Sequence, residues 1–587
     1  MITMIKTLAA HIKQFKTASL LTPLCMVLEV VTEMIIPLLM ASIIDDGISK
    51  GDMGHIWKTG GLMIACAAFG LLTGVLGGVF GARASTGFAR NLRKAMFENI
   101  QTFSFSNIDK FSTAGLVTRL TTDVTNIQNA YQMILRMCFR APFSLIIAMI
   151  MAFAINAELA KIYLIAVFIL GIFLMLIVSN AGKSFSEVFK KYDDLNSSIQ
   201  ENVSAIRVVK AYVREDHEKE KFTAASGNIY KMFVKAENIV ALNNPLMQIT
   251  VYTCILLISW LGAKLIISSG GSELTTGELT SLLSYCMNIL MNLMMLSMIF
   301  VMTTMSAASG RRIAEVLEEK SDITNPDDPD TDIPDGSIEF KNVNFSYRSG
   351  DGEPVLKNIN LSIKSGETVG IIGSTGSSKS SLVNLISRLY DVNEGSVMVG
   401  GKDVRSYDIE TLRNNVAVVL QKNVLFSGTI LDNLRWGNKE ASEEECIRAC
   451  RLACADEFIE RMPEKYNTHI EQGGSNVSGG QKQRLCIARA LMKKPKVLIL
   501  DDSTSAVDTA TDAKIRKAFA EEIPGTTKLI IAQRISSVQN SDRIIVLDDG
   551  TVSGFGTHEE LLETNEIYRD VYESQTGGSG DFDENKD

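Results

Sequence analysis

The residues best suited to chemistry lie between Asn476 and Asp508, in a stretch that holds a turn, an apolar run and two acids. The apolar run, Val497 to Leu500, has the length and composition of a buried parallel strand. It ends directly in Asp501 and Asp502. Carboxylates are the ligands that hard cations prefer. The stretch therefore predicts a metal and water site at the tip of a strand.

The turn that precedes this strand is suited to grip phosphate. Ser478-Gly479-Gly480-Gln481 offers a hydroxyl and consecutive backbone N–H groups at the start of a helix that the pattern predicts from Gln481 to Met492. Backbone N–H groups and the dipole at a helix N-terminus both favour an anion.

A glycine-rich loop provides a second phosphate grip, Gly373-Ser374-Thr375-Gly376-Ser377-Ser378-Lys379-Ser380. It follows a predicted strand, Val369 to Ile372, and opens a helix predicted from Lys379 to Tyr390, which is the context that a phosphate-binding loop requires. In such a loop the backbone N–H groups cradle phosphates and the lysine reaches the β and γ groups. The hydroxyl of Ser380 is then expected to bind magnesium.

The rest of the chain must position these groups, and its two halves differ in composition. Residues 1–310 contain six apolar segments long enough to span a bilayer, which takes about 20 residues each, whereas residues 338–575 are mixed and polar. A net charge of −9 argues against a nucleic-acid partner, because phosphate-backbone binding needs clustered Lys and Arg. The ligand is therefore expected to be small or lipid-like. The predicted spans are 18–44, 60–83, 134–156, 160–181, 246–269 and 278–306.

The connections between spans set the topology. Two long polar linkers, between spans two and three and between spans four and five, are rich in Lys and Arg, and the other connections are short and poor in both. The positive-inside rule then puts both termini and both long linkers in the cytoplasm. Nine cysteines form no CxxC pair, and Cys446, Cys450 and Cys454, spaced four apart, are read as a stripe packed like small hydrophobes rather than as metal ligands.

Taken together, and in the order in which they occur along the chain, these motifs resemble those of an ABC exporter half. The resemblance covers residues from about 5 to 575. It implies a six-span α-helical transmembrane domain plus an α/β P-loop ATPase domain with a helical subdomain. It also implies ATP and Mg²⁺ as cofactors, ATP-driven export, and a multi-pass protein of the plasma membrane, the inner or cell membrane of a bacterium. The expected divisions are an amphipathic interfacial helix (1–17), the transmembrane domain (18–318), an acidic linker (319–337), the ATPase domain (338–575) and a disordered tail (576–587).

The resemblance assigns roles to residues that match the family's motifs. Tyr347 would stack on adenine, Gln421 would sense magnesium and the γ-phosphate, and Asp501 would hold the magnesium together with Ser380. Asn107 to Phe111 and Ala211 to Glu215 would be turns that dock on the ATPase domains, the alternative being plain surface loops. The expected nucleotide-binding set is Tyr347, Gly373, Ser374, Thr375, Gly376, Ser377, Ser378, Lys379, Ser380, Ser381, Ser478, Gly479, Gly480 and Gln481.

Three positions of this chain's own ATP site depart from the family pattern. Ser378 replaces the glycine before the lysine, Asp502 replaces the glutamate that polarises the attacking water, and Gln533 replaces the switch histidine. A carboxylate displaced by about 1 Å can cost roughly a hundredfold in rate, and glutamine carries no positive charge. The signature, Val477 to Gln481, departs only by valine for leucine.

This asymmetry predicts one subunit of a heterodimeric exporter. In the family, two ATPase domains sandwich ATP head to tail, so the altered residues belong to this chain's own site and the sound signature belongs to the partner's. The expected partners are a different half-transporter chain, an amphipathic small molecule or lipid as substrate, and the membrane. The alternatives are a slow homodimer, exporting lipid or peptide, and an ATP-gated regulatory or channel-like protein that does not pump.

Ionisable residues inside the predicted spans are candidates for the transport cavity. Glu29 and Glu33 share one helix face, as do Arg136 and Arg140, and such groups cost about 2.5–3.5 kcal/mol each on insertion unless they face water or one another. The arginines could instead reach the headgroups, and the glutamates could pair with another helix. Span six carries a methionine stripe that includes Met291, Met295 and Met298, suited to a promiscuous apolar wall or to plain packing.

Overall fold

The computed structural model describes residues 2–347, 353–374, 376–503 and 505–576. The chain forms two compact units. The helical unit comprises the chain up to Thr102 together with Ser112–Glu319, and the sheet unit comprises Phe103–Phe111 together with the chain from Lys320 onward.

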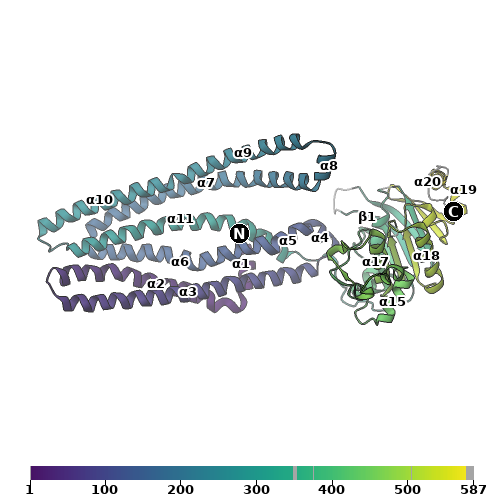
Figure 1. The fold of residues 1–587 in the computed structure, drawn as a ribbon, viewed down its shortest axis with the longest axis horizontal. Helices are drawn as coiled ribbons and strands as arrows, with labels where there is room; N and C mark the ends of the chain where they lie inside the picture. The colour runs from purple at the N-terminus through teal and green to yellow at the C-terminus, as the bar shows by residue number, and fades with distance from the viewer. Residues whose placement is uncertain (1, 348–352, 375, 504, 577–587) are drawn as a thin grey trace. The chain divides into compact units, whose positions relative to one another are not determined.

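The helical unit is built from long antiparallel helices joined by short turns (Figure 1). Among the described residues, six helical stretches are long and apolar enough to cross a membrane, namely Thr3–Ile48, Met53–Gln101, Thr113–Ile155, Ala157–Ala181, Glu215–Ser269 and Thr276–Phe300. The six predicted spans are confirmed. The elements are α1 (Ile2–Ala9), η1 (Ala10–Phe15), α2 (Lys16–Ser42), η2 (Ile43–Ile48), α3 (Met53–Gln101), α5 (Thr113–Thr118), η3 (Arg119–Asp123), α6 (Val124–Ile155), α7 (Ala157–Ser204), α8 (Ile206–Ala211), α9 (Glu215–Ala241), α10 (Asn243–Ser269) and α11 (Thr276–Glu318).

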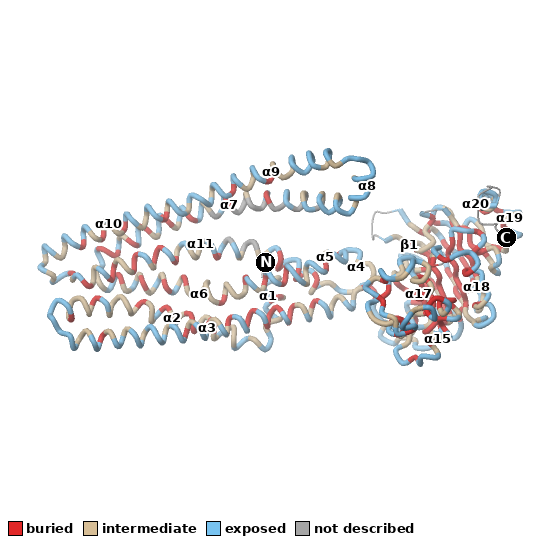
Figure 2. Tube along the Cα trace, in the orientation of Figure 1, coloured by how far each residue is buried: buried red, intermediate tan, exposed pale blue. Residues whose placement is uncertain are grey.

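Buried tyrosines tie these helices together where α2, α6, α7, α10 and α11 meet. The hydroxyl of Tyr163 donates to the carbonyl of Leu282 at 2.7 Å, and that of Tyr285 donates to the carbonyl of Met34 at 2.7 Å. A buried hydroxyl without a partner is costly, so these bonds fix how the helices pair. Elsewhere much of the helical surface is exposed (Figure 2), and many of the exposed residues are large and apolar, as expected of segments that meet lipid.

The N-terminal segment is not one continuous helix. Lys13 has φ 44° and interrupts the helical path between α1 and α2. Phe15 then packs so closely on α3 that a Cβ on Gly87 would clash with its ring. Leu8 is buried as well, so part of the apolar face predicted for residues 1–17 packs within the helical unit.

The sheet unit contains a six-stranded sheet in the order β12-β11-β3-β10-β9-β6, a four-stranded sheet in the order β2-β1-β4-β5 and the pair β7-β8. Its strands are β1 (Ile338–Phe345), β2 (Leu356–Ile363), β3 (Thr368–Gly373), β4 (Glu394–Val399), β5 (Lys402–Asp403), β6 (Val416–Val419), β7 (Gly428–Thr429), β8 (His469–Ile470), β9 (Val497–Asp501), β10 (Thr527–Ile531), β11 (Arg543–Asp548) and β12 (Thr551–Gly556). Its helices are α4 (Phe105–Phe111), α12 (Lys379–Ile386), η4 (Val404–Ser406), α13 (Ile409–Asn415), α14 (Ile430–Arg435), α15 (Glu443–Leu452), α16 (Asp456–Ile459), η5 (Lys465–Asn467), η6 (Gln472–Gly474), α17 (Gly479–Leu491), α18 (Thr509–Glu522), η7 (Ile535–Ser537), α19 (His558–Thr564) and α20 (Glu566–Thr576).

The large sheet explains the apolar runs in the sequence. All residues of β9 and β10 are buried, and β3, β6, β9, β10 and β11 run parallel. A parallel sheet is covered on both faces, so its strands read as continuous apolar segments rather than as alternating ones. Cys446, Cys450 and Cys454 are buried in the core beside this sheet, which confirms that they pack as small hydrophobes.

Several predicted boundaries shift. The helix after the glycine-rich loop ends at Ile386 instead of Tyr390, because Arg388 has φ 51° and cannot continue it. The predicted hairpin at Asp549-Gly550 is confirmed, with both residues at positive φ between β11 and β12. The acidic segment 319–337 packs on the sheet unit, since Ile333 is buried and the Asp330 N–H donates to the carbonyl of Ser406 at 2.9 Å. Thr576 still belongs to α20, and the predicted tail beyond it lies outside the described residues.

Candidate ATP site

The carboxyl ends of four parallel strands place most of the predicted site at one edge of the large sheet. Ile531 of β10 pairs with Asp501 of β9 and with Ile371 of β3, and Val419 of β6 pairs with Leu500. Each of these strand ends leads into one part of the predicted site, namely the glycine-rich loop, the two acids, the Gln533 segment or Gln421. Ligands of open α/β sheets bind at this edge.

The loop after β3 holds the ammonium group of Lys379 by hydrogen bonds that a bound phosphate could replace. Lys379 Nζ donates to the carbonyls of Gly373 and Ser374, both at 2.8 Å, and to Ser377 Oγ at 3.2 Å. Burial lowers the pKa of Lys379, and the nearby Asp501 and Asp502 oppose this shift. An arriving phosphate anion would compensate a desolvated ammonium group in the same way. Thr375 lies outside the described residues.

Ser378 occupies a backbone conformation that glycine adopts more readily. Its φ of 70° and ψ of 22° are left-handed, directly before α12. A non-glycine residue pays roughly 1 kcal/mol or more there, because its Cβ crowds the following carbonyl. The structure therefore gives a conformational reason for the glycine that the motif calls for.

Asp501 and Ser380 form an oxygen pair suited to Mg²⁺. The Asp501 side chain is buried and hydrogen-bonds to the side chain of Ser380. Burial raises the pKa of Asp501, while the Ser380 bond and the Lys379 charge oppose the rise. A carboxylate and a hydroxyl are hard ligands, and a cation there would offset the cost of burying the acid. Gln421 follows β6 at the same sheet edge, although its side chain is exposed.

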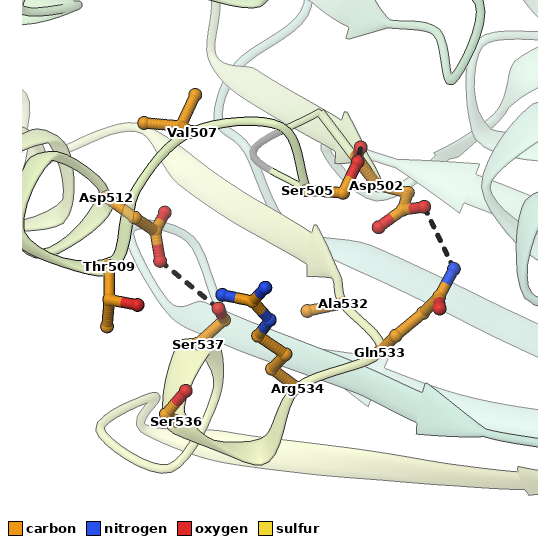
Figure 3. Close-up of a pocket in the computed structure, with 10 residues that line it drawn as sticks. All are labelled: Asp502, Ser505, Val507, Thr509, Asp512, Ala532, Gln533, Arg534, Ser536 and Ser537. Atoms are coloured by element: carbon orange, nitrogen blue, oxygen red, sulfur yellow. Dashed lines mark hydrogen bonds between the residues drawn. The ribbon is translucent and has the colours of Figure 1, made fainter. Parts of the chain in front are cut away.

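The side chain of Asp502 is hydrogen-bonded to that of Gln533. Gln533 Nε2 donates to Asp502 Oδ2 at 3.0 Å, and the two side chains point toward one another across the close-up in Figure 3. Both line a cavity of about 160 Å³ together with Ser505, Val507, Thr509, Asp512, Ala532, Arg534, Ser536 and Ser537. Asp502 also has φ 47°, and its N–H donates to the carbonyl of Ile531 at 3.1 Å, so backbone and side chain are both held.

Tyr347 lies against the helix that leaves the phosphate loop. Its hydroxyl hydrogen-bonds to Ser381 Oγ at 2.8 Å, and its ring packs edge-on against Tyr390 at 5.0 Å between centroids. The side chain is 45% exposed, which leaves a ring face open for stacking. This placement agrees with a role in holding the adenine.

The signature turn is a well-formed helix start. Ser478 and Gln481 make a capping box at α17, in which Ser478 Oγ accepts from the Gln481 N–H at 3.3 Å and Gln481 Oε1 accepts from the Ser478 N–H at 2.9 Å. A Cβ on Gly480 would lie 2.7 Å from the carbonyl oxygen of Ala506, so glycine is required there. The turn thus packs against the segment that follows Asp502.

Two further groups were not singled out in the sequence. Gln483 is buried, accepts from the Ala506 N–H at 3.0 Å and donates to Ser505 Oγ at 3.3 Å, which fastens the signature helix to the segment after the acids. The only feature of the sequence that could have marked Gln483 was a glutamine on the apolar side of a helix. Tyr390 Oη donates to Asp109 Oδ2 of α4 at 2.7 Å. Helix α4 carries the predicted docking turn Asn107–Phe111 and is grouped with the sheet unit, and its docking role stays a prediction.

The candidate cavity residues of the helical unit separate into three groups. Arg140 forms salt bridges with Glu29 at 2.7 Å and with Glu33 at 2.9 Å, so these three side chains form a salt-bridge cluster between α2 and α6. Arg136 and Glu29 line a cavity of about 300 Å³ with Gly70, Leu71, Gly74 and Val75 of α3. Met291 and Met298 are exposed and Met295 is half-buried along α11, so the methionines are not part of that cavity.

Comparison with known proteins agrees with this architecture. The description "ABC transporter transmembrane region" matches residues 20–319, and the description "ABC transporter" matches residues 356–505. The chain belongs to the ABC transporter family. An uncharacterized ABC transporter ATP-binding protein of Bacillus subtilis, YfiB, is 39% identical over 568 residues, which cover 96% of this chain and 98% of the relative.

Two other similar proteins narrow the class. The ATP-dependent lipid A-core flippase of Syntrophus aciditrophicus is 33% identical over 496 residues, covering 83% of this chain and 80% of the flippase. A solved bacterial Atm1-family ABC exporter with ATP bound superposes with a TM-score of 0.81 at 24% identity, covering 96% of this chain and 99% of that one. The protein is a multi-pass membrane protein of the ABC exporter type, with a membrane domain fused to an ATP-hydrolysing domain.

Proposed function

We propose that this chain is one half of a heterodimeric exporter, with a slow ATP site on its own phosphate loop and a signature turn that completes the hydrolytic site of a different partner chain. The observation that carries the proposal is the Gln533–Asp502 hydrogen bond. It joins the two positions at which the catalytic glutamate and the switch histidine of the family are replaced. Asp502 is one methylene shorter than the glutamate that it replaces, and Gln533 Nε2 occupies one of its carboxylate oxygens, so its carboxylate is displaced and partly engaged where the family polarises water.

Electrostatics supports a nucleotide-holding role for this chain's own site. Lys379, Ser380 and Asp501 would hold ATP and Mg²⁺, Gln421 would report on them, and Tyr347 would stack on the adenine. Bound Mg²⁺ would neutralise charge on the β and γ phosphates. Gln533 is neutral at every pH, so it cannot supply the positive charge that an imidazolium offers the γ-phosphate. The site is therefore proposed to clamp ATP and to turn it over slowly.

The signature turn has no comparable defect. Its capping box is complete, and the close approach of Gly480 to Ala506 is preserved. In a head-to-tail sandwich, Ser478 and the two glycines would face ATP that is bound to the partner. The partner is therefore proposed to carry the glutamate and the histidine that this chain lacks.

The decisive experiment compares ATP turnover of the purified chain alone with turnover after co-expression with candidate half-transporters. We expect little turnover alone and a large rise with the correct partner. Within the assembled complex, Ser478→Ala should impair turnover more than Lys379→Ala. Equal effects of the two substitutions, or brisk turnover by the chain alone, would refute the assignment of sites.

A slow homodimer is the second candidate, and the intact Lys379, Ser380 and Asp501 set favours it. Two copies would then share two weakened sites. Under this function the isolated chain hydrolyses ATP slowly but measurably, and Ser478→Ala and Lys379→Ala abolish the activity equally.

We also propose that the cargo is an amphipathic molecule, a lipid or a drug-like compound, with an anionic group that approaches Arg136. Arg136 lines the cavity beside Glu29, and its Nε atom is buried without a hydrogen-bond partner among the described residues. Similarity to a lipid A-core flippase agrees with a lipid-like cargo. Stimulation of ATP turnover by anionic amphiphiles should survive Arg136→Lys and be lost in Arg136→Gln. Equal stimulation by neutral amphiphiles would contradict this cargo.

The proposed location is the plasma membrane, with both termini in the cytoplasm. The Lys- and Arg-rich linkers support this orientation. Cysteine-accessibility labelling at Asp52, in a short loop, and at Tyr212, in a long linker, would test it from opposite sides of the membrane. Labelling of both positions from the same side would contradict the proposed orientation.

A further inference from the structure

The segment that carries Gln533 is held from two sides, and one of the holders is the last helix of the described chain. On the first side, Arg516 Nη1 of α18 donates to the carbonyl of Ser536 at 2.9 Å. Ser537 Oγ donates to Asp512 Oδ2 at 3.1 Å, a bond drawn in Figure 3. These bonds from α18 fix the far end of the segment, at Ser536 and Ser537. The backbone next to Gln533 is held from elsewhere.

On the second side, a single amide from α20 spans the backbone at Gln533. Gln575 Nε2 donates to the carbonyl of Gln533 at 2.9 Å, and Gln575 Oε1 accepts from the Ile535 N–H at 2.8 Å. A side-chain amide presents a donor and an acceptor side by side. It can therefore bond the carbonyl of Gln533 and the N–H of Ile535 at once, as the backbone of a neighbouring strand would. The backbone of Gln533 is therefore set by α20, while its side chain reaches Asp502.

Helix α20 is itself anchored to the body of the sheet unit. Tyr568 is fully buried, and its hydroxyl hydrogen-bonds to His558 Nδ1 at 2.7 Å. The Tyr568 N–H also donates to Asn565 Oδ1 at 2.9 Å. The anchoring extends to Tyr572, whose ring centroid lies 5.4 Å from that of His558, whereas Gln575 lies beyond it, one residue from the end of the helix, and is exposed. Beyond Tyr572, the side-chain hydrogen bonds that join the described part of α20 to other elements are the two made by Gln575.

We infer that Gln575 is a positioning residue that couples the end of α20 to the ATP site through the backbone of Gln533. Coupling of this kind is reciprocal: nucleotide at the site changes the order of α20, and anything that restrains α20 changes nucleotide affinity by the same factor. The inference concerns nucleotide binding, so it does not depend on the heterodimer proposed above. It adds a control point on a helix outside the phosphate loop, the acids and the signature turn.

Hydrogen exchange of the full-length protein, with and without ATP and Mg²⁺, tests this directly, because exchange reports local opening of backbone bonds. In the unmodified protein we expect ATP to slow exchange in peptides covering 531–537 and 566–576. Gln575→Met keeps a long unbranched side chain and removes both hydrogen bonds. In this variant the response of 531–537 should persist, and the response of 566–576 should fall at least about threefold, as two ordinary hydrogen bonds allow.

Two matched variants make the outcome specific. Glu573→Ala alters an exposed neighbour on the same helix and should leave both responses unchanged. Gln575→Glu keeps the acceptor for the Ile535 N–H but turns an oxygen toward the Gln533 carbonyl, so Ile535 should stay protected while ATP affinity falls about two- to tenfold. The inference is overturned if the 566–576 response is the same in Gln575→Met, or if ATP never affects that peptide. Absence of any response in 531–537 would overturn the nucleotide assignment as well.

Discussion

Gln533 donates its side-chain amide to the carboxylate of Asp502 at 3.0 Å, so two residues that follow different strands act as one bonded pair. The partner of Asp502 is therefore neutral at the position where the family has histidine. Restoring one member of the pair alone is expected to do little. Asp502→Glu with Gln533→His should raise ATP turnover at this chain's site, by up to about a hundredfold if positioning of the carboxylate limits the rate. Turnover of the assembled complex at saturating ATP measures this.

The single substitutions are the controls for that pair. Residues that touch usually show non-additive effects, with interaction energies of about 0.5–3 kcal/mol. Additive single effects, or kinetics unchanged in the double variant, would show that the Asp502–Gln533 pair does not limit turnover.

Ser378→Gly should stabilise the phosphate loop and tighten ATP binding. The substitution removes a Cβ from a residue at φ 70°, which relieves about 1 kcal/mol of backbone strain and corresponds to up to about fivefold in affinity. Ser377→Gly is the matched control, because Ser377 is buried and its Oγ accepts from Lys379, so that loss should weaken the loop. Titration with a fluorescent ATP analogue distinguishes the two. Weaker binding by Ser378→Gly would contradict the strain argument.

Patterns within short segments were enough to predict the architecture. The six spans follow from the length of apolar runs, and the strand before Asp501 follows from four consecutive apolar residues that a parallel sheet buries on both faces. The order of motifs then predicted which strand ends carry the phosphate loop and the acids. The motif also marked Ser378 as a position where the family has glycine, and the structure then showed the left-handed backbone that explains this preference.

The partners in contacts between distant segments could not be predicted. Helical spacing suggested that Glu29 and Glu33 could pair with another helix, but it did not single out Arg140, 111 residues from Glu29, and nothing in the sequence marked the Gln575–Gln533 bond, which joins residues 42 apart. Helix ends were missed for a different reason. The early end of α12 depends on a positive φ at Arg388, a residue type that gives no turn signal.

Tyr390→Phe should weaken the attachment of α4 within the sheet unit while leaving its aromatic packing intact. The phenol donates to Asp109 at 2.7 Å, and the Phe105 ring lies 6.0 Å from the Tyr390 ring between centroids. A bond to a partly exposed carboxylate contributes about 1 kcal/mol. Asp109→Asn keeps an acceptor and should cost less. Coupling of ATP turnover to transport, measured in vesicles, should fall in Tyr390→Phe, and an unchanged ratio would contradict a docking role for α4.

The sheet unit should lose stability in acid through Glu367. Burial opposes ionisation of Glu367, but the hydrogen bonds and charge of Arg543 outweigh it and hold the pKa of Glu367 below its ordinary value of 4.5. Arg543 Nη2 lies 2.6 Å from Glu367 Oε2. A carboxyl with a lowered pKa stabilises the fold above its unfolded pKa, and this contribution disappears as the pH falls through the folded value. Glu367→Gln should flatten the dependence of melting temperature on pH below about 4.5. An unchanged slope would assign the acid sensitivity elsewhere.

Arg140→Met should destabilise the helical unit more than either glutamate substitution does. Arg140 bonds to both Glu29 and Glu33, so its loss leaves two carboxylates one helical turn apart without the cation that bridges them. Removing one partner of a fully buried pair costs about 3–5 kcal/mol, and the partial exposure of this cluster reduces the expected cost to about 1–3 kcal/mol. Glu33→Gln leaves the Glu29 bond in place and should cost less. The triple variant Glu29→Gln, Glu33→Gln, Arg140→Met removes every charge together and should recover most of the stability. Melting curves in detergent rank the unmodified protein, Arg140→Met, Glu33→Gln and the triple variant by stability. A triple variant no more stable than Arg140→Met would show that the arginine contributes by packing rather than by charge.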